Sequence, residues 1–319
     1  MLITRLLRRK PGLSFAVALL LLGLTACGPA GTTPTGPSPT TTPGTKAGPI
    51  IVVATTTQIG SMITAVAGDH ATVRTILPPG ADPHEYEPRP SDVQMIAESA
   101  LVLKNGVGLD DWLDKLIANA GGQHPLQIVS AGVPIRKGDE QEPGGDPHIW
   151  FSVTNAMTMT RNVRDALVRV DAAHAADYNA NATAYLARLA DLDRYIFAQI
   201  ATIPPDQRKM VTNHDAFGYF IDRYGLTFAG AIIPSMSTEA EPSAQDVSIL
   251  IAKIKAEHVK AIFLESSINP KLAQQIGGDA GVKVVDTLYG DSLGDPGTPG
   301  ATYESMMRYN TDTIVAALK

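Results

Sequence analysis

The residues from 175 to 203 contain neither glycine nor proline, and this uninterrupted stretch most constrains how the chain can fold. The stretch is rich in alanine, leucine and arginine, and it stops directly before Pro204-Pro205. Glycine and proline are the residues that most destabilise a helix interior, so their absence predicts one long helix over residues 175–203. Because a chain of 319 residues is longer than one average domain, we interpret this helix as a connector between two domains.

The chain before this helix alternates between strand-like and helix-like patterns. Residues 51–54 form a short β-branched run, and residues 72–77 and 101–103 are also strand-like. Ser91 and Gln94 form a capping-box pattern, which predicts the start of a short helix. Apolar residues recur at the spacing of one helix face at Ile59, Met62, Ile63 and Val66. This order of strands and helices is typical of a mostly parallel sheet that is flanked by helices.

The same alternation returns after the long helix. We predict strands at residues 210–211, 228–233, 261–264 and 282–285, and helices at residues 217–224, after Ser243, after Pro270 and from Ala301. The chain is therefore expected to be an α/β protein with two similar lobes, at residues 50–174 and 204–319, joined by the long helix. Each lobe is expected to contain a mostly parallel sheet flanked by helices.

The N-terminal residues have the parts of an export signal. A positive cluster at the start is formed by Arg5, Arg8, Arg9 and Lys10. The apolar run at residues 13–24 is too short to span a bilayer but suits the centre of a signal peptide. The run ends in Leu24-Thr25-Ala26-Cys27, which resembles the bacterial lipobox, where the cysteine is acylated and cleavage precedes it. A small buried cysteine closing an ordinary signal is the alternative, but Cys27 is the only cysteine and stands at the expected position.

We therefore predict a lipoprotein signal segment at residues 1–27, with Cys27 as the lipid-bearing residue. Residues 28–49 contain little besides glycine, alanine, proline, threonine and serine, and such a composition cannot bury enough apolar surface to offset the entropy of ordering. This segment is expected to be a disordered tether between the lipid and the folded lobes. The protein would then be anchored to the lipid bilayer on the extracytoplasmic face of a bacterial membrane.

The charge of the chain excludes one class of partner. The formal net charge is −6, with 26 basic and 32 acidic residues. Proteins that bind nucleic acid need a surplus of lysine and arginine against the phosphates, so no nucleic-acid partner is expected.

Three of the seven histidines lie in unusual local sequences. These are Asp82-Pro83-His84, Asp146-Pro147-His148 and Asn213-His214-Asp215. Proline fixes φ and pushes the residue before it towards extended geometry, so His84 and His148 are each expected on a stiff turn that suits a metal ligand. The carboxylates of Asp82, Asp146 and Asp215 are candidates for orienting an imidazole, although Asp82 and Asp146 equally suit turn caps.

The remaining histidines are interpreted as ordinary surface or core residues, which are far commoner than ligands: His70, His124, His174 and His258. The separations of the three unusual histidines fit no local zinc-finger pattern. Spacing alone therefore does not decide whether they bind a metal.

Five segments, in this order along the chain, resemble motifs of one protein family: residues 81–92, 146–152, 213–226, 239–247 and 288–294. The family is that of the zinc and manganese substrate-binding proteins of ABC importers, known as cluster A-I or TroA-like proteins. The resemblance extends from about residue 50 to the end of the chain. It implies two α/β lobes joined by a rigid helix, with a metal ion in the cleft between them, and the stretch from Ala175 matches the helix.

The resemblance also implies a ligand set. His84 and His148 match the two ligands of the N-terminal lobe, and His214 and Asp291 match the two ligands of the C-terminal lobe. Glu265 follows a predicted strand and faces the crevice, so an outer hydrogen bond to a ligand is expected there. Three neutral imidazoles and one carboxylate would fill a tetrahedral zinc shell without thiolates.

Zinc is the expected cargo, and manganese is the alternative. Family members that bind manganese tend to have a glutamate where His214 stands, and imidazole suits zinc better than manganese. One feature argues against zinc: many zinc members carry a long histidine-rich loop before the second ligand motif, whereas residues 137–145 (KGDEQEPGG) are short, acidic and without histidine.

The expected function is capture of a divalent transition metal and its delivery to the membrane permease of an ABC importer, by a monomeric protein that is not an enzyme. A metal-dependent hydrolase or hydratase is one alternative, but it would keep an open fourth position for water, which Asp291 fills, and no GxSxG or HExxH motif is present. A surface adhesin is the other alternative, and it would not need a metal site between the lobes.

Overall fold

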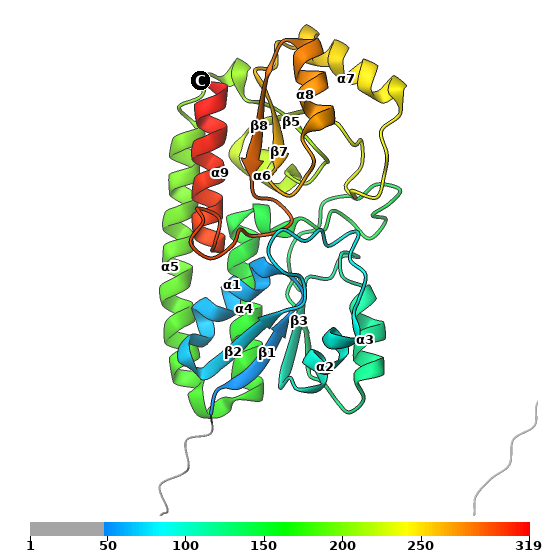
Figure 1. The fold of residues 1–319 in the computed structure, drawn as a ribbon. Helices are drawn as coiled ribbons and strands as arrows, with labels where there is room; N and C mark the ends of the chain where they lie inside the picture. Colours follow the sequence, from blue (N-terminus) through cyan, green and yellow to red (C-terminus); the bar gives the residue numbers. More distant parts are fainter. Residues whose placement is uncertain (1–47) are drawn as a thin grey trace, which may run out of the picture. The chain divides into compact units, whose positions relative to one another are not determined.

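The computed structural model describes residues 48–319, which contain two four-stranded sheets, one in each lobe (Figure 1). The predicted signal segment with Cys27, and all but the last two residues of the predicted tether, lie outside the described residues. Every pair of neighbouring strands within the two sheets is parallel. The predicted α/β class with two parallel sheets is therefore confirmed.

Both sheets have the same topology. The strand order is β2-β1-β3-β4 in the N-terminal lobe and β6-β5-β7-β8 in the C-terminal lobe. The strand order therefore reverses at the equivalent place in each sheet, between β1 and β3 in the first and between β5 and β7 in the second. The strands of the first sheet are β1 (Ile50–Ala54), β2 (Ala71–Thr75), β3 (Leu101–Lys104) and β4 (Leu126–Ile128). Those of the second are β5 (Lys209–Thr212), β6 (Thr227–Ala231), β7 (Ala261–Glu265) and β8 (Lys283–Leu288).

Helices cover both faces of each sheet. The N-terminal lobe has α1 (Thr57–Ala67), α2 (Pro90–Ala97), α3 (Trp112–Ala120) and α4 (Val153–Val170), and the C-terminal lobe has α6 (Gly218–Tyr224), α7 (Ala244–Ala256), α8 (Lys271–Ala280) and α9 (Tyr303–Leu318). Short 3-10 turns lie at η1 (Gly68–His70), η2 (Ile149–Phe151), η3 (Ala172–His174) and η4 (Pro205–Gln207).

Successive side chains of a strand point to opposite faces of the sheet, so they pack into different cores. Val52 and Ala54 of β1 pack into the core that α1 and α4 share, whereas Val53 packs towards α2 and α3. In the second sheet, Phe263 of β7 belongs to the first of these cores, whereas Ile262 packs towards α7 and α8. A single apolar cluster therefore runs from the first sheet to the second.

The helix α5 (Ala175–Ile200) lies along both lobes and is covered by helices from each (Figure 1). Its 26 residues span about 39 Å at 1.5 Å per residue. It packs against α1 and α4 of the N-terminal lobe and against α6 and α9 of the C-terminal lobe. One stripe of the helix is buried, at Tyr178, Ala182, Tyr185, Leu189, Leu192, Ile196 and Ile200.

Two sequence-based expectations about helix ends are corrected. The long helix ends at Ile200, before the predicted end at Ile203, because Ile203 precedes Pro204 and such a residue disfavours helical geometry. The helix α2 is not capped by Ser91 and Gln94. It begins with Pro90 in its first turn, and the Asp92 carboxylate accepts a 2.6 Å hydrogen bond from the backbone N–H of Arg89.

Candidate metal centre

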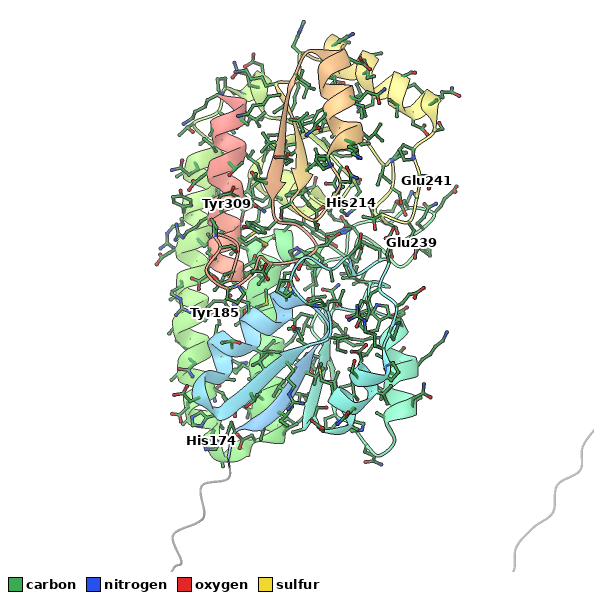
Figure 2. All side chains as sticks on the ribbon, viewed as in Figure 1. His174, Tyr185, His214, Glu239, Glu241 and Tyr309 are labelled. Carbon is green, nitrogen blue, oxygen red and sulfur yellow. The ribbon has the colours of Figure 1, made fainter. Side chains whose placement is uncertain are left out.

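The C-terminal lobe carries three ionisable side chains where its strands end. His214 follows β5, Glu265 is the last residue of β7, and Asp291 lies in the loop after β8. In open parallel sheets, ligands bind at the carboxyl ends of the strands, beside the point where the strand order reverses. The strands β5 and β7 flank that point, and Figure 2 shows His214 at the boundary between the two lobes.

The N-terminal lobe contributes His84 and His148, each at the end of an Asp-Pro-His tripeptide. In both tripeptides the aspartate Oδ1 accepts a hydrogen bond from the backbone N–H of the histidine, at 2.9 Å in the first and 3.0 Å in the second. This bond closes a short turn, and the proline inside it fixes φ. The repeated tripeptide therefore builds the same stiff turn twice.

The four predicted ligand residues converge. Their donor atoms, which are the three histidine Nε2 atoms and an Asp291 oxygen, all lie within 4.8 Å of one another. The Nε2 atom of His148 is 3.3 Å from that of His84 and 3.4 Å from that of His214. The Asp291 carboxylate lies 3.8 Å from His84 Nε2, 3.4 Å from His148 Nε2 and 3.2 Å from His214 Nε2.

These separations suit four donors around one small cation. Zinc to nitrogen bonds are about 2.0–2.1 Å long, so the edges of a tetrahedral shell are about 3.3–3.4 Å. Four of the five separations given above, at 3.2–3.4 Å, lie close to that edge length, and the separation of His84 from Asp291 is longer, at 3.8 Å. All four side chains are at most 5% exposed, so a cation bound among them would be shielded from water.

Each imidazole directs its second nitrogen towards a carboxylate. His148 Nδ1 forms a 2.9 Å hydrogen bond with Asp146 Oδ1, whereas His84 Nδ1 lies 3.2 Å from Glu142 Oε1 and His214 Nδ1 lies 3.2 Å from Glu265 Oε1. The side-chain amide nitrogen of Asn213 lies closer to His214 Nδ1, at 2.8 Å. A hydrogen atom held on Nδ1 leaves the lone pair on Nε2, and a carboxylate partner increases the basicity of the ring. In all three rings Nε2, the atom that would bind a metal, faces the other donors.

The carboxylates named from the sequence differ in what they contact. Asp146 and Glu265 lie beside imidazoles, whereas Asp82 and Asp215 do not. For Asp215 this corrects the expectation, and for Asp82 it agrees with the alternative that the residue caps a turn. Asp82 bonds the backbone of His84 and accepts a 2.7 Å hydrogen bond from Thr238, so it caps the turn and joins the lobes. The Oδ1 atom of Asp215 is buried with no hydrogen-bond partner among the described residues.

Sequence reasoning missed Glu142, the partner of His84. It lies in the acidic segment 137–145, and no local pattern separates it from the other acidic residues there. Its contact arises because the loop folds back over the N-terminal lobe, close to Gly108.

Asp291 is held by contacts from both lobes. Its backbone N–H donates a 2.7 Å hydrogen bond to Glu265 Oε2. The carbonyl of Gly290, the residue before it, accepts hydrogen bonds from Gln58 at 2.9 Å and from Trp150 at 3.2 Å, both in the N-terminal lobe. A Cβ atom on residue 290 would lie 2.0 Å from Glu265 Oε2, so glycine is needed there for the carboxylate to approach.

Burial and the neighbouring charges shift the pKa values of the clustered residues in opposite directions. Burial alone would lower the pKa of His148 and of His214, but the Asp291 carboxylate outweighs it, with Asp146 assisting at His148 and Glu265 at His214, so the pKa of each histidine lies above its usual value. Burial alone would likewise raise the pKa of Asp291, but the surrounding histidines hold it well below its ordinary value. Protons therefore compete with a metal for His148 and His214 at a higher pH than they would for a free imidazole.

Metal affinity is expected to fall as the pH decreases, starting above the ordinary imidazole pKa of about 6.5. A metal binds the deprotonated ring, and the raised pKa values of His148 and His214 mean that protons compete at a higher pH than for a free imidazole. The apparent Kd, measured by chelator competition between about pH 8 and pH 5.5, should rise by more than about tenfold per pH unit, because at least two protons are displaced. A Kd that stays constant down to about pH 6.5 would contradict this expectation.

The other histidines lie away from the cluster. His70 and His174 stack on each other with ring centroids 4.0 Å apart, and each pairs with an aspartate. His124 Nε2 is 2.6 Å from the carbonyl of Gly121. These contacts agree with their interpretation as ordinary residues.

A cavity borders the cluster at His84. It has a volume of about 390 Å³ and is lined by His84 and Glu142 together with Trp112 and Glu239. Figure 2 shows Glu239 on the loop between β6 and α7, at the boundary between the lobes. The acidic residues that line this cavity would attract a cation.

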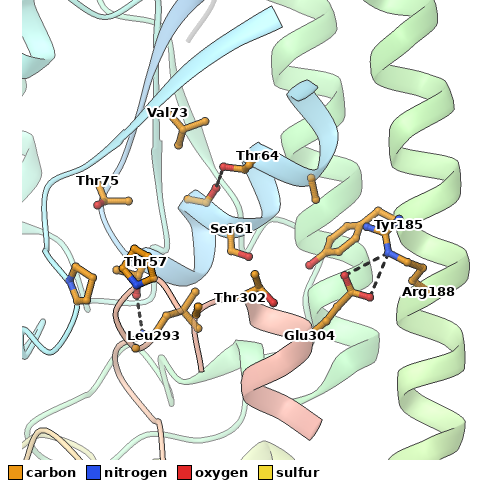
Figure 3. A pocket seen from close by; sticks show the side chains of 16 residues that line it. Thr57, Ser61, Thr64, Val73, Thr75, Tyr185, Arg188, Leu293, Thr302 and Glu304 are labelled. Atoms are coloured by element: carbon orange, nitrogen blue, oxygen red, sulfur yellow. Dashed lines mark hydrogen bonds and ion pairs between the residues drawn. The ribbon is translucent and has the colours of Figure 1, made fainter. Parts of the chain in front are cut away.

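A separate cavity of about 440 Å³ lies against α1 and α5 and is lined by hydroxyl groups and by the ion pair of Arg188 with Glu304 (Figure 3). Tyr185 also faces it. None of the four clustered residues lines this cavity, so it is not part of the candidate metal centre.

Two α/β lobes with a buried, cation-suited cluster between them define a class, that of the two-lobed binding proteins that hold a small ligand between their lobes. Comparisons with known proteins give the family. The family model described as "Zinc-uptake complex component A periplasmic" (ZnuA) matches residues 52–317.

Individual proteins of this kind are similar over most of their length. The manganese-binding lipoprotein MntA of Halalkalibacterium halodurans is 33% identical over 269 residues, which cover 84% of this chain and 88% of MntA. The iron ABC transporter substrate-binding lipoprotein MtsA of Streptococcus pyogenes is 32% identical over 289 residues, which cover 88% of this chain and 93% of MtsA. The solved structure of the periplasmic zinc-binding protein TroA from Treponema pallidum is 32% identical, with a TM-score of 0.79 over 85% of this chain and 99% of TroA.

The chain belongs to the ZnuA family of metal-binding substrate-binding proteins of ABC importers. The resemblance described from the sequence is thereby confirmed. Membership of this family also places the chain among binding proteins rather than enzymes, so neither the hydrolase nor the adhesin alternative is favoured.

Proposed function

We propose that this protein captures zinc outside the cytoplasm and delivers it to the permease of an ABC importer, with His84, His148, His214 and Asp291 as the metal ligands. The observation that supports this most is the spacing of the four donor atoms, which is close to the edge of a tetrahedral zinc shell. A full set of protein donors leaves no position for an activated water molecule, which suits transport rather than hydrolysis.

The choice of zinc rests on the donors and not on the relatives. The three similar proteins are named for manganese, iron and zinc, so their names do not select one metal. Three imidazole nitrogens and one carboxylate oxygen favour zinc, whereas manganese prefers a larger share of oxygen donors. Manganese is therefore the second candidate for the cargo.

Metal analysis of protein purified without chelator tests this proposal. We expect about one zinc ion per chain, retained in competition with excess manganese. A transport role further predicts that deletion of the gene impairs growth in zinc-poor medium and that added zinc restores it. Protein that binds no transition metal after chelation and reloading would overturn the proposal.

We also propose that a lipid on Cys27 anchors the protein to the bilayer. The relatives MntA and MtsA are named lipoproteins, and the sequence before Cys27 resembles a lipobox. Within residues 48–319, no helix is both long and apolar enough to span a membrane.

The substitution Cys27→Ser is expected to release the protein from the membrane into the soluble fraction, because acylation of this residue would supply the anchor. Fractionation followed by immunoblotting measures the change, with Ser38→Ala in the predicted tether as a matched control that should stay membrane-bound. A Cys27→Ser protein that has lost its signal segment and still sediments with membranes would refute the lipid anchor.

A further inference from the structure

Residues 136–146 form a closed loop, which we call the latch loop. Its two ends meet, since the backbone N–H of Asp146 donates a 3.0 Å hydrogen bond to the carbonyl of Arg136. Inside it, Asp139 Oδ1 accepts hydrogen bonds from the backbone N–H groups of Gln141 and Glu142 at 2.9 and 2.8 Å. The loop is therefore a compact unit whose ends are close together, as in Ω-loops.

The ends of the latch loop are docked on α6 of the C-terminal lobe. Arg136 Nε donates a 2.7 Å hydrogen bond to Asp222, and the backbone N–H of Arg136 donates one of 2.9 Å to Tyr219 Oη. The same Tyr219 hydroxyl donates a 2.9 Å hydrogen bond to the carbonyl of Asp146. The Arg136 guanidinium packs so closely on Gly218 that a Cβ there would lie 1.7 Å from Nη1.

The tip of the latch loop is docked on the loop after β6. Asp139 Oδ2 accepts a 2.7 Å hydrogen bond from the backbone N–H of Met236 and one of 3.1 Å from Ser235 Oγ. Burial raises the pKa of Asp139, but the hydrogen bonds from Met236 and Glu142 outweigh it, so the pKa lies below its usual value. The carboxylate is therefore charged, and its bonds across the lobe boundary are charge-assisted.

The inner side of the latch loop holds two imidazoles of the candidate metal centre. Asp146 pairs with His148 Nδ1 at 2.9 Å, and Glu142 pairs with His84 Nδ1 at 3.2 Å. Arg136 also forms an ion pair with Asp146, which links the docked end to His148. One short loop therefore contacts the C-terminal lobe at two places and also contacts His84 and His148, the two histidines of the candidate metal centre that lie in the N-terminal lobe.

We propose that the latch loop couples contact between the lobes to retention of the metal, with Asp139 as a positioning residue that acts through Glu142 and His84. When the loop is docked, the carboxylates hold both rings with Nε2 towards the cation. When the contact of Asp139 with Ser235 and Met236 breaks, Glu142 withdraws from His84 and the cation leaves faster. This inference rests on the proposed function, since it assumes that the cluster binds a metal.

The substitution Asp139→Asn tests the latch. It removes the charged acceptor for Met236 without touching any proposed ligand. Zinc release into excess chromogenic chelator, followed by stopped-flow absorbance, should be about tenfold faster than for the unsubstituted protein, whereas zinc association should change by less than about twofold. The melting temperature of the metal-free protein should fall only slightly, because the amide oxygen of the replacement can still accept hydrogen bonds.

A control variant and a double variant test whether the change in zinc release is specific to the latch loop. Asp191→Asn makes the same charge change on the exposed face of α5, where Asp191 forms an ion pair with Arg194, and it should release zinc at the original rate. In a double-mutant cycle, Asp139→Asn combined with Glu142→Ala should accelerate release by less than the product of the two separate effects, because both act on His84.

The results of these experiments distinguish a failure of the latch from a failure of the proposed metal-binding function. If the unsubstituted protein binds no metal, both the proposed function and the latch are overturned. If it binds metal and Asp139→Asn releases zinc at the original rate, only the latch is overturned. The latch is also overturned if Asp139→Asn strongly lowers the melting temperature of the metal-free protein and slows zinc association as well as accelerating release.

Discussion

Alanine at His84 or at Asp291 is expected to remove the stabilisation that a bound metal gives to the folded protein. A ligand that binds only the folded chain adds RT ln(1 + [L]/Kd) to the free energy of unfolding, which is about 2.7 kcal/mol at about 100-fold excess over Kd. The two residues come from opposite lobes, and each supplies one of the four converging donor atoms. The increase in melting temperature on addition of zinc, measured by calorimetry after chelation, should therefore vanish in either variant.

His124→Ala is the matched control for this experiment. His124 lies away from the cluster, beside the carbonyl of Gly121, so its loss should leave the zinc-induced increase intact. A full increase in the Asp291→Ala variant would remove Asp291 from the ligand set. It would also reopen the fourth coordination position that a hydrolytic site requires.

Glutamate at position 214 is expected to lower the preference for zinc over manganese by at least about tenfold, or about 1.4 kcal/mol of relative binding free energy. The substitution exchanges a neutral nitrogen donor for an anionic oxygen donor, so the set becomes two histidines and two carboxylates. Harder oxygen donors suit manganese better. Zinc should still bind more tightly in absolute terms, because manganese is at the weak end of the Irving–Williams order.

The quantity to measure is the ratio of the two Kd values, obtained by competitive titration of both proteins in one buffer. His214→Gln provides a control that removes the imidazole without adding charge, and it should weaken both metals without favouring manganese to the same extent. A ratio that His214→Glu leaves unchanged would show that His214 does not set the selectivity. The proposal of zinc would then lose its main support.

Much of the fold could be predicted because its signals are local. The strand-like runs and the helix after Ser243 depend on neighbouring residues alone, and the structure has a capping box formed by Ser243 and Asp246 at that place. The helices α3 and α4 and the strand β4 were not predicted. The strand β4 has only three residues, too few for an alternating pattern. The helix α4 does have apolar residues at helical spacing, at Val153, Ala156, Met159, Val163 and Leu167, so its sequence carries the signal of a helix.

The candidate site could be predicted less directly. His84 and His148 are 64 residues apart, and His148 and His214 are 66 residues apart, so no local spacing brings them together. The ligand set came from the resemblance to a family, whereas Glu265 came from the rule that strand ends face the crevice. Neither the resemblance nor the rule indicated Glu142, because its contact with His84 depends on how the latch loop folds.

One apolar core extends past α5 from one sheet to the other. This shared core affects how readily proteases can degrade the protein. Because the two lobes share this core, neither can lose its packing without exposing the other, and we expect them to unfold in one cooperative step. Proteases cleave chains that open, and a lobe that cannot open by itself offers them no partly unfolded substrate. Resistance to proteolysis is thus a property of the whole folded unit, and cleavage within α5 is expected to destabilise both lobes together.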